Sequence, residues 1–154
     1  MPVITHDLGA DLRAAARDNV PLVLFVTQPN CPFCEKARRE FFAPMAREAA
    51  ENSVSKPGVG KPLLLRELAT GTLPLVRRPD GSQTTPLSIA KRYGVRVFPT
   101  IVIVDGSSKL LVEPIEGLQL PDFYQAYIDE AIARAQALLS APISAPAVSP
   151  KTPQ

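Results

Sequence analysis

The chain has 154 residues, of which 45% are hydrophobic and 21% charged, and its formal net charge is +2 at pH 7; this is the balance of an ordinary globular protein with one core. Its basic residues are scattered, with three adjacent pairs and no contiguous stripe, which argues against nucleic acid as a partner. No apolar run approaches the ~20 residues that a membrane-spanning helix requires, so we expect a protein that does not span a membrane.

The chain should begin with a helix and a buried strand. Residues 7–19 carry apolar side chains at near-helical spacing, and Asp7 is a suitable N-cap. Residues 21–27, PLVLFVT, are continuously apolar and rich in β-branched side chains. This pattern predicts a strand that is buried on both faces.

A second helix should follow after a short turn. It starts at Cys31, with Pro32 at its first position, where the missing N–H costs nothing. We expect Pro44 to end or kink this helix near Phe42, because proline cannot donate to the helical ladder. Residues 45–52 then resume the helix.

The middle of the chain alternates between loops and one strand. Residues 53–61 are rich in Gly, Pro and Ser and predict a loop, and residues 62–68 predict the second strand. Residues 69–85 show no clear period and predict a loop with a possible turn at Asp80-Gly81.

The next segment should hold a short helix and a hairpin. Thr85 is a suitable N-cap for a helix over residues 86–94. Residues 95–106 predict a strand that Pro99 interrupts, and residues 109–117 predict a paired strand across a tight turn.

The chain should close with a helix over residues 120–139, where the apolar side chains form one stripe. Residues 141–154 are rich in Pro and Ala and predict a disordered tail after a single domain over residues 1–140. The order of elements indicates an α/β fold. Its central mixed sheet has a parallel core and an antiparallel hairpin, and helices flank it.

Cys31 and Cys34 are the only cysteines in the sequence. At the N-cap of a helix, the Cys31 sulfur receives the first backbone N–H groups and the positive end of the helix dipole. This placement favours the thiolate, which is the reactive form of cysteine. With Cys31 exposed and Cys34 tucked inside the first turn, the pair can perform thiol–disulfide exchange.

The two thiols could also serve chemistry other than redox exchange. A structural zinc site needs four ligands, and the chain offers only these cysteines and the lone His6. An iron–sulfur cluster shared between two chains, Cys–His catalysis and inert buried thiols are further alternatives. The spacing of the cysteines after a strand and a turn, with Pro32 between them, favours redox chemistry, with no metal and no cofactor.

Two stretches together resemble the thioredoxin superfamily: LVLFVTQPNCPFC, which contains the dithiol, and YGVRVFPTIVIVDG, some 65 residues later. The resemblance implies a thioredoxin-like fold in which the Phe98–Pro99 peptide bond is cis and faces the dithiol. It also implies that Phe98, Pro99 and Thr100 form a substrate-binding loop. Pro32 and Phe33, between the cysteines, complete the expected substrate surface.

The chain departs from a typical cytosolic thioredoxin at two positions near the dithiol. Asn30 stands where that family has Trp, and Phe25 stands where it has a buried Asp that assists proton transfer. A general base for Cys34 is therefore not evident from the sequence. Glutaredoxins also carry Cys-Pro-aromatic-Cys but are shorter and lack the leading helix.

A narrower resemblance is to bacterial periplasmic thioredoxin-like proteins of the Sox type. Their motifs are similar to residues 31–44, 92–100 and 121–132. The resemblance implies a periplasmic protein whose secretory signal has been replaced by a starting Met. The N-terminal residues, which lack the pattern of a signal, also fit a cytoplasmic protein.

The sequence thus leads to a thiol:disulfide oxidoreductase with Cys31 as nucleophile and Cys34 as resolving thiol. By the resemblance, it reduces disulfides of protein partners and is recycled by a membrane or soluble electron donor. The alternative is a binding module of the same fold whose two thiolates hold Cu(I).

Overall fold

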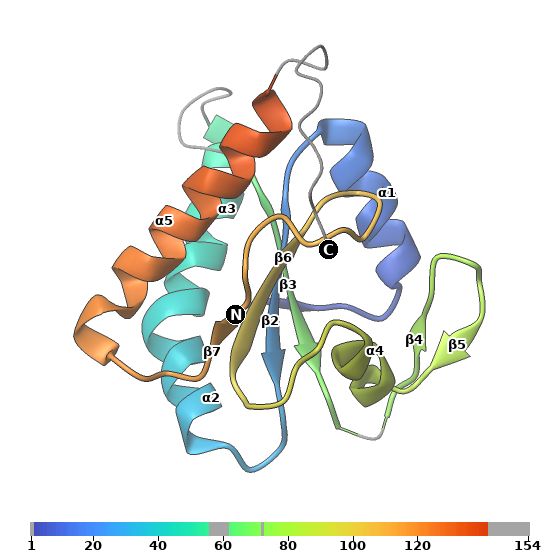
Figure 1. Ribbon diagram of the computed structural model, residues 1–154, viewed down its shortest axis with the longest axis horizontal. Helices are drawn as coiled ribbons and strands as arrows, with labels where there is room; N and C mark the ends of the chain where they lie inside the picture. The colour runs from blue at the N-terminus through green and yellow to red at the C-terminus, as the bar shows by residue number, and fades with distance from the viewer. Residues whose placement is uncertain (1, 56–61, 72, 142–154) are drawn as a thin grey trace.

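A mixed five-stranded sheet runs through the middle of the molecule, in the order β1-β3-β2-β6-β7 (Figure 1). The computed structural model describes residues 2–55, 62–71 and 73–141. The strands are β1 (Val3–Ile4), β2 (Leu22–Thr27), β3 (Leu64–Ala69), β6 (Thr100–Val104) and β7 (Ile115–Glu116). Strands β1, β3 and β2 pair in parallel, whereas β6 and β7 add antiparallel pairs. This is the mixed α/β architecture that the sequence predicted.

Helices cover both faces of this sheet (Figure 1). The helices are α1 (Leu8–Asp18), α2 (Pro32–Ala37), the π-helical segment η1 (Arg38–Phe42), α3 (Ala43–Ser55), α4 (Pro86–Arg92) and α5 (Pro121–Ser140). Helices α1 and α4 pack on one face, and α2, η1, α3 and α5 pack on the other. The side chains of Asp7 and Thr85 cap α1 and α4, which confirms both predicted N-caps.

Strand β2 joins the two halves of the core. All its residues are buried, which confirms the prediction of a strand buried on both faces. Its side chains alternate, so that Leu24 and Val26 enter the α1/α4 half while Val23 and Phe25 enter the α3/α5 half. Strand β2 lies between β3 and β6 and is hydrogen-bonded to both. The sheet therefore fixes the position of its carboxyl end, from which the chain leads to the two cysteines.

The helix does not end at Pro44, since the chain stays helical from α2 through α3, and the disturbance predicted near Phe42 is a π-helical segment. Just before the proline the chain forms the π-helical segment, in which the N–H of Ala43 donates to the carbonyl of Arg38. Proline cannot fit an undisturbed α-helical ladder. The wider turn absorbs this irregularity, so the helix shifts its hydrogen-bond register instead of ending.

The predicted hairpin is much shorter than expected. Of residues 95–106 only Thr100–Val104 form a strand. Of residues 109–117 only Ile115–Glu116 form a strand paired with it, and Leu110 adds an isolated antiparallel bridge to Val104. Prolines explain both limits, because Pro99 and Pro114 lack the N–H that a ladder requires. The predicted second strand is confirmed with its bounds moved to Leu64–Ala69.

The sequence did not predict three of the strands, because each has only two residues and so shows no period. They are β1 and the pair β4 (Val76–Arg77) and β5 (Gln83–Thr84), which form a separate two-stranded sheet. The predicted turn at Asp80-Gly81 joins β4 to β5. The predicted loop over 53–61 begins inside α3, and its residues 56–61 lie outside the described residues, as do residues 142–154 of the predicted tail. The division at residue 140 stays a prediction.

Candidate functional site

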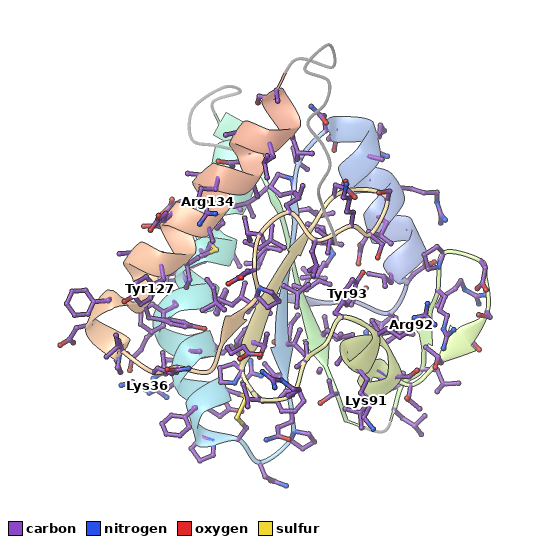
Figure 2. All side chains as sticks on the ribbon, viewed as in Figure 1. Lys36, Lys91, Arg92, Tyr93, Tyr127 and Arg134 are labelled. Carbon is purple, nitrogen blue, oxygen red and sulfur yellow. A yellow bond between two sulfur atoms is a disulfide. The ribbon has the colours of Figure 1, made fainter. Side chains whose placement is uncertain are left out.

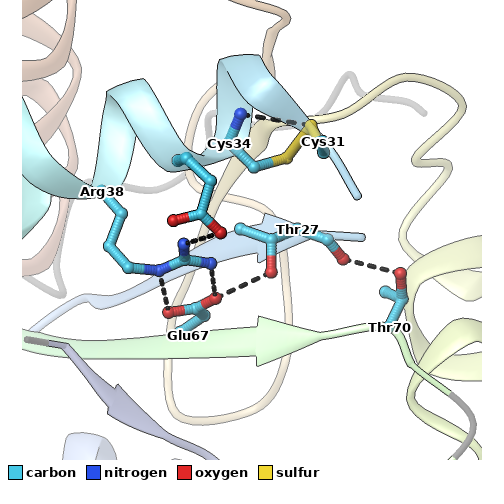
Figure 3. A network of polar contacts seen from close by, with 7 residues as sticks. Thr27, Cys31, Cys34, Arg38, Glu67 and Thr70 are labelled. Atoms are coloured by element: carbon cyan, nitrogen blue, oxygen red, sulfur yellow. Dashed lines mark hydrogen bonds and ion pairs between the residues drawn. A yellow bond between two sulfur atoms is a disulfide. The ribbon is translucent and has the colours of Figure 1, made fainter. Parts of the chain in front are cut away.

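The two cysteines lie where β2 gives way to α2. Asn30 precedes them with a φ of 55°, a left-handed conformation that asparagine tolerates in tight turns. Cys31 is the N-cap of α2, as predicted, and its Sγ accepts the backbone N–H of Cys34 at 3.1 Å (Figure 3). The two sulfurs form a disulfide, with the Cα atoms 5.2 Å apart.

The two sulfur-bearing residues differ in accessibility, but less than the sequence suggested. Cys34 is 1% exposed and Cys31 only 7% exposed, so the prediction of an exposed first thiol is wrong for the disulfide form. The opposing loop explains this burial, because the Phe98 carbonyl oxygen lies 4.0 Å from the Cys31 sulfur. Cys31 is the more exposed of the two residues.

The loop opposite the dithiol has a fixed shape. The Phe98–Pro99 peptide bond is cis, and Pro99 is buried. Thr100 is fully buried and its hydroxyl donates to the Val97 carbonyl at 2.6 Å, while the N–H of Gly117 donates to the Pro99 carbonyl at 2.7 Å. Thr100 therefore shapes the loop from within, whereas the Phe98 carbonyl faces the Cys31 sulfur.

Exposed apolar side chains lie both between the cysteines and in the loop opposite them. Phe33, between the cysteines, is 61% exposed, and Val97, in the opposing loop, is 43% exposed. Pro32 is also exposed, whereas Phe98 is half-buried and packs against the core. Large apolar side chains left in water beside a reactive group favour contact with another molecule.

A buried polar network lies beneath the dithiol, and sequence reasoning missed it. Glu67 of β3 is 2% exposed, and one of its carboxylate oxygens accepts the Thr27 hydroxyl at 2.8 Å. Arg38 reaches the same carboxylate with two nitrogens, at 3.1 and 2.5 Å (Figure 3). The carboxylate is thus fully paired, as burial of a charge requires.

Arg38 belongs to the same helical segment as the cysteines, one turn after Cys34. Its guanidinium also pairs with Glu35 at 2.9 Å and lies over the Phe25 ring, 5.8 Å from the ring centroid. The hydrogen bond to Glu67, more than any other contact, raises the pKa of Arg38 further above its already high value. Arg38 is therefore a permanent positive charge beneath the dithiol.

The same network fixes the end of β2. The Thr27 carbonyl accepts both the hydroxyl of Thr70, at 2.6 Å, and its backbone N–H, at 2.9 Å. Thr27 therefore contacts Glu67 through its side chain and Thr70 through its main chain. Both contacts fix the end of β2, which leads to the dithiol.

The register of the sheet shows how the acid was missed. Phe25 stands at the position where typical thioredoxins have a buried Asp. In the sheet it pairs directly with Glu67 of the neighbouring strand. The acid is therefore present but arrives from β3 rather than β2. A lone Glu within the apolar run PLLLREL was the only signal in the sequence.

Residues 2–55, 62–71 and 73–141 contain no group of three or more His, Cys, Asp or Glu side chains that could hold a metal. In the same ranges no helix is long and apolar enough to cross a membrane. The labelled basic side chains are spread over α2, α4 and α5 (Figure 2).

The mixed sheet and the disulfide at the start of α2 define the molecule as a dithiol–disulfide oxidoreductase. Residues 8–132 match the family model of the thioredoxin-like domain, and the chain belongs to this family. The predicted thioredoxin-like fold is thereby confirmed.

Two solved structures share the fold of the chain at low sequence identity. DsbH oxidoreductase is 17% identical, with 86% of each chain covered and a TM-score of 0.57. Thioredoxin from Fasciola hepatica is also 17% identical, with 86% of this chain and 98% of that chain covered and a TM-score of 0.52. The periplasmic thioredoxin SoxS from Paracoccus pantotrophus is 21% identical over 75% of this chain and 98% of that chain, with a TM-score of 0.44. No curated protein sequence matches the chain.

Proposed function

We propose that the Cys-Pro-Phe-Cys dithiol reduces disulfides of protein partners. The observation that carries the proposal is the Cys31 sulfur at the N-cap of α2. There it accepts the Cys34 N–H and faces the Phe98 carbonyl. A sulfur in this position has a donor for its negative charge on one side and a peptide backbone on the other. The donor stabilises the thiolate, and the backbone can contact an extended chain that contains the disulfide under attack.

In the first step the Cys31 thiolate attacks one sulfur of the partner disulfide. A bond forms between Cys31 and that sulfur, the partner S–S bond breaks, and the other partner sulfur leaves as a thiolate. The backbone N–H of Cys34, which reaches the Cys31 sulfur in the disulfide form, also stabilises the attacking thiolate.

In the second step Cys34 resolves the mixed disulfide. Cys34 gives up its proton, which ends on a departing partner sulfur, and attacks the Cys31 sulfur. The mixed disulfide breaks and the second partner thiol is released. Two electrons have passed to the partner, and Cys31 and Cys34 form the disulfide seen in the structure.

The loop opposite the dithiol and the residues between the cysteines would hold the partner. In this proposal the backbone of Phe98, with Pro99 beside it, contacts an extended partner segment, and Thr100 keeps the loop in shape. Pro32 and Phe33 offer apolar contact on the other side of the sulfurs.

The setting of the reaction is part of the same proposal. By its resemblance to the Sox-type group, the protein acts in the periplasm and receives its electrons from a membrane or soluble dithiol donor. Immunodetection in fractionated source cells tests the compartment, and recovery only in the cytoplasmic fraction would contradict it.

A trapping experiment tests the two assigned roles. In the Cys34→Ser variant the reaction should stop after the first step and leave a partner covalently bound through Cys31, visible on non-reducing gels and released by dithiothreitol. Reduction of insulin disulfides by the same variant should fall at least 10²-fold. The Cys31→Ser variant is the control: it should trap nothing, although serine remains a good N-cap and the fold persists.

The direction of electron flow is tested by equilibrating the wild-type protein with a glutathione series. A reduction potential near that of thioredoxin, about −270 mV, is expected of a reductase. A value near −120 mV would mean that the protein donates disulfides instead. If no disulfide forms and the purified protein holds stoichiometric copper, the Cu(I)-binding alternative replaces the proposal.

A further inference from the structure

We propose that Arg38 and Glu67 act on the reduction potential of the Cys31–Cys34 dithiol with opposite signs, so that Glu67 cancels the positive charge that Arg38 would otherwise present to the sulfurs. This inference rests on the proposed function. It adds to the site two positioning residues that neither touch a partner nor exchange electrons.

The first support is the location of Arg38. It follows Cys34 by four residues on the helix that carries both cysteines, and side chains with this spacing are neighbours on one helix face. That face packs on the sheet, because Cys34 and Ala37 are buried and Arg38 reaches β3 (Figure 3). The charge and the dithiol therefore lie on the same, shielded side of the helix.

The second support is the completeness of the pairing. Glu67 receives two nitrogens of Arg38 and the hydroxyl of Thr27, and its side chain is 3% exposed. The Arg38 side chain is 13% exposed. Water therefore screens this pair weakly, and loss of either charge would be felt by neighbouring groups.

The sign of the effect follows from the charges of the two redox states. The disulfide is neutral, whereas reduction adds two electrons and, at a pH where Cys31 is a thiolate, one proton, which stays on Cys34. A positive charge nearby stabilises the reduced form and raises the reduction potential. An uncompensated negative charge does the opposite.

The Glu67→Gln variant removes one negative charge while an amide oxygen still accepts hydrogen bonds from Thr27 and Arg38. Whatever the contribution of exposed Glu35, the local charge changes by +1. We expect the equilibrium constant with glutathione to shift about tenfold toward the dithiol, which for a two-electron couple raises the potential by about 30 mV.

The Arg38→Met variant should shift the constant the other way, toward the disulfide, because Glu67 is left without its partner. The double variant Arg38→Met/Glu67→Gln removes both charges, and its constant should return to within about threefold of the wild-type value. Opposite shifts that cancel are the signature of an electrostatic role, which a purely structural role would not produce.

The matched control is Asp11→Asn. Asp11 forms an ion pair of the same type with Arg66, the neighbour of Glu67 in β3, but from helix α1 on the other face of the sheet. We expect this variant to lose some stability and to keep the wild-type constant within about twofold.

The outcomes separate this inference from the proposed function. If the wild-type protein forms the disulfide and reduces a partner but Glu67→Gln leaves the glutathione constant unchanged, the inference fails and the function stands. If the single variants shift the constant in the same direction, the network acts only by holding the helix. If Arg38→Met does not fold, the inference is still tested by comparing the glutathione constants of Glu67→Gln and Asp11→Asn. A wild-type protein that forms no disulfide refutes the function itself.

Discussion

Neighbouring residues of strand β3 make the same kind of contact on opposite faces of the sheet. On one face Glu67 pairs with Arg38 and accepts the Thr27 hydroxyl. On the other, Arg66 pairs with Asp11, and that carboxylate accepts the Thr5 hydroxyl at 2.6 Å. Each set consists of an arginine, a carboxylate and a threonine.

The two sets differ in burial and in what they attach to the sheet. The side chains of Arg38 and Glu67 are 13% and 3% exposed, whereas those of Arg66 and Asp11 are 24% and 13% exposed. The first set attaches the helical segment that carries the dithiol to β3, and the second attaches α1 to β3. The two sets therefore share their chemistry and differ in depth and in the element that each attaches to the sheet.

The largest difference between the sets should appear when each arginine is removed. Arg38→Met leaves the Glu67 carboxylate buried without a cation, so the free energy of unfolding of the oxidised protein should fall by about 3–5 kcal/mol. Urea denaturation followed by far-UV circular dichroism measures it. A loss below 1 kcal/mol would show that water reaches Glu67 and that the two sets are equivalent.

The next largest effect should come from the threonine beneath the dithiol. Thr27→Val keeps the shape of the side chain but removes the 2.8 Å hydrogen bond to Glu67. Hydrogen bonds to charged groups contribute ~1.5–3 kcal/mol, and we expect a loss of about 2 kcal/mol in the free energy of unfolding. Because the Thr70 hydroxyl and N–H still donate to the Thr27 carbonyl, insulin reduction by the folded variant should stay within about threefold of wild type.

The buried set shows what the sequence could and could not predict. The N-caps Asp7, Thr85 and Cys31 were predicted correctly because a cap and its N–H partner lie three residues apart. The dithiol at the start of α2 depends on the same local signal. In contrast, the partners of Glu67 lie 29 and 40 residues away in the chain, and only strand register brings them together.

The same argument covers the errors in the fold. Strands β2 and β3 could be predicted because their apolar runs match their burial, whereas β1, β4 and β5 are too short to show a period. The π-helical segment was missed because a proline pattern indicates a disturbed ladder without saying how the chain will relieve it. The burial of Cys31 depends on a loop contact from Phe98, 67 residues further along the chain.

On the α1 face the loss should be smaller. Arg66→Met leaves Asp11 within reach of water, so the free energy of unfolding should fall by about 1 kcal/mol, in the range of partly exposed ion pairs. Screening sharpens the contrast: 1 M NaCl should reduce the effect of Arg66→Met more than that of Arg38→Met. Equal salt sensitivity of the two variants would contradict the difference in burial.

The smallest effect should come from Thr5→Val. It removes the hydrogen bond to Asp11, but water can replace the hydroxyl at this partly exposed carboxylate, so we expect a loss of about 0.5 kcal/mol. Thr27→Val is the matched variant on the other face, since both replace a buried threonine that donates to a carboxylate. If Thr5→Val costs as much stability as Thr27→Val, depth does not distinguish the two sets. In that case the glutathione equilibrium is the only property that sets Glu67 apart from Asp11.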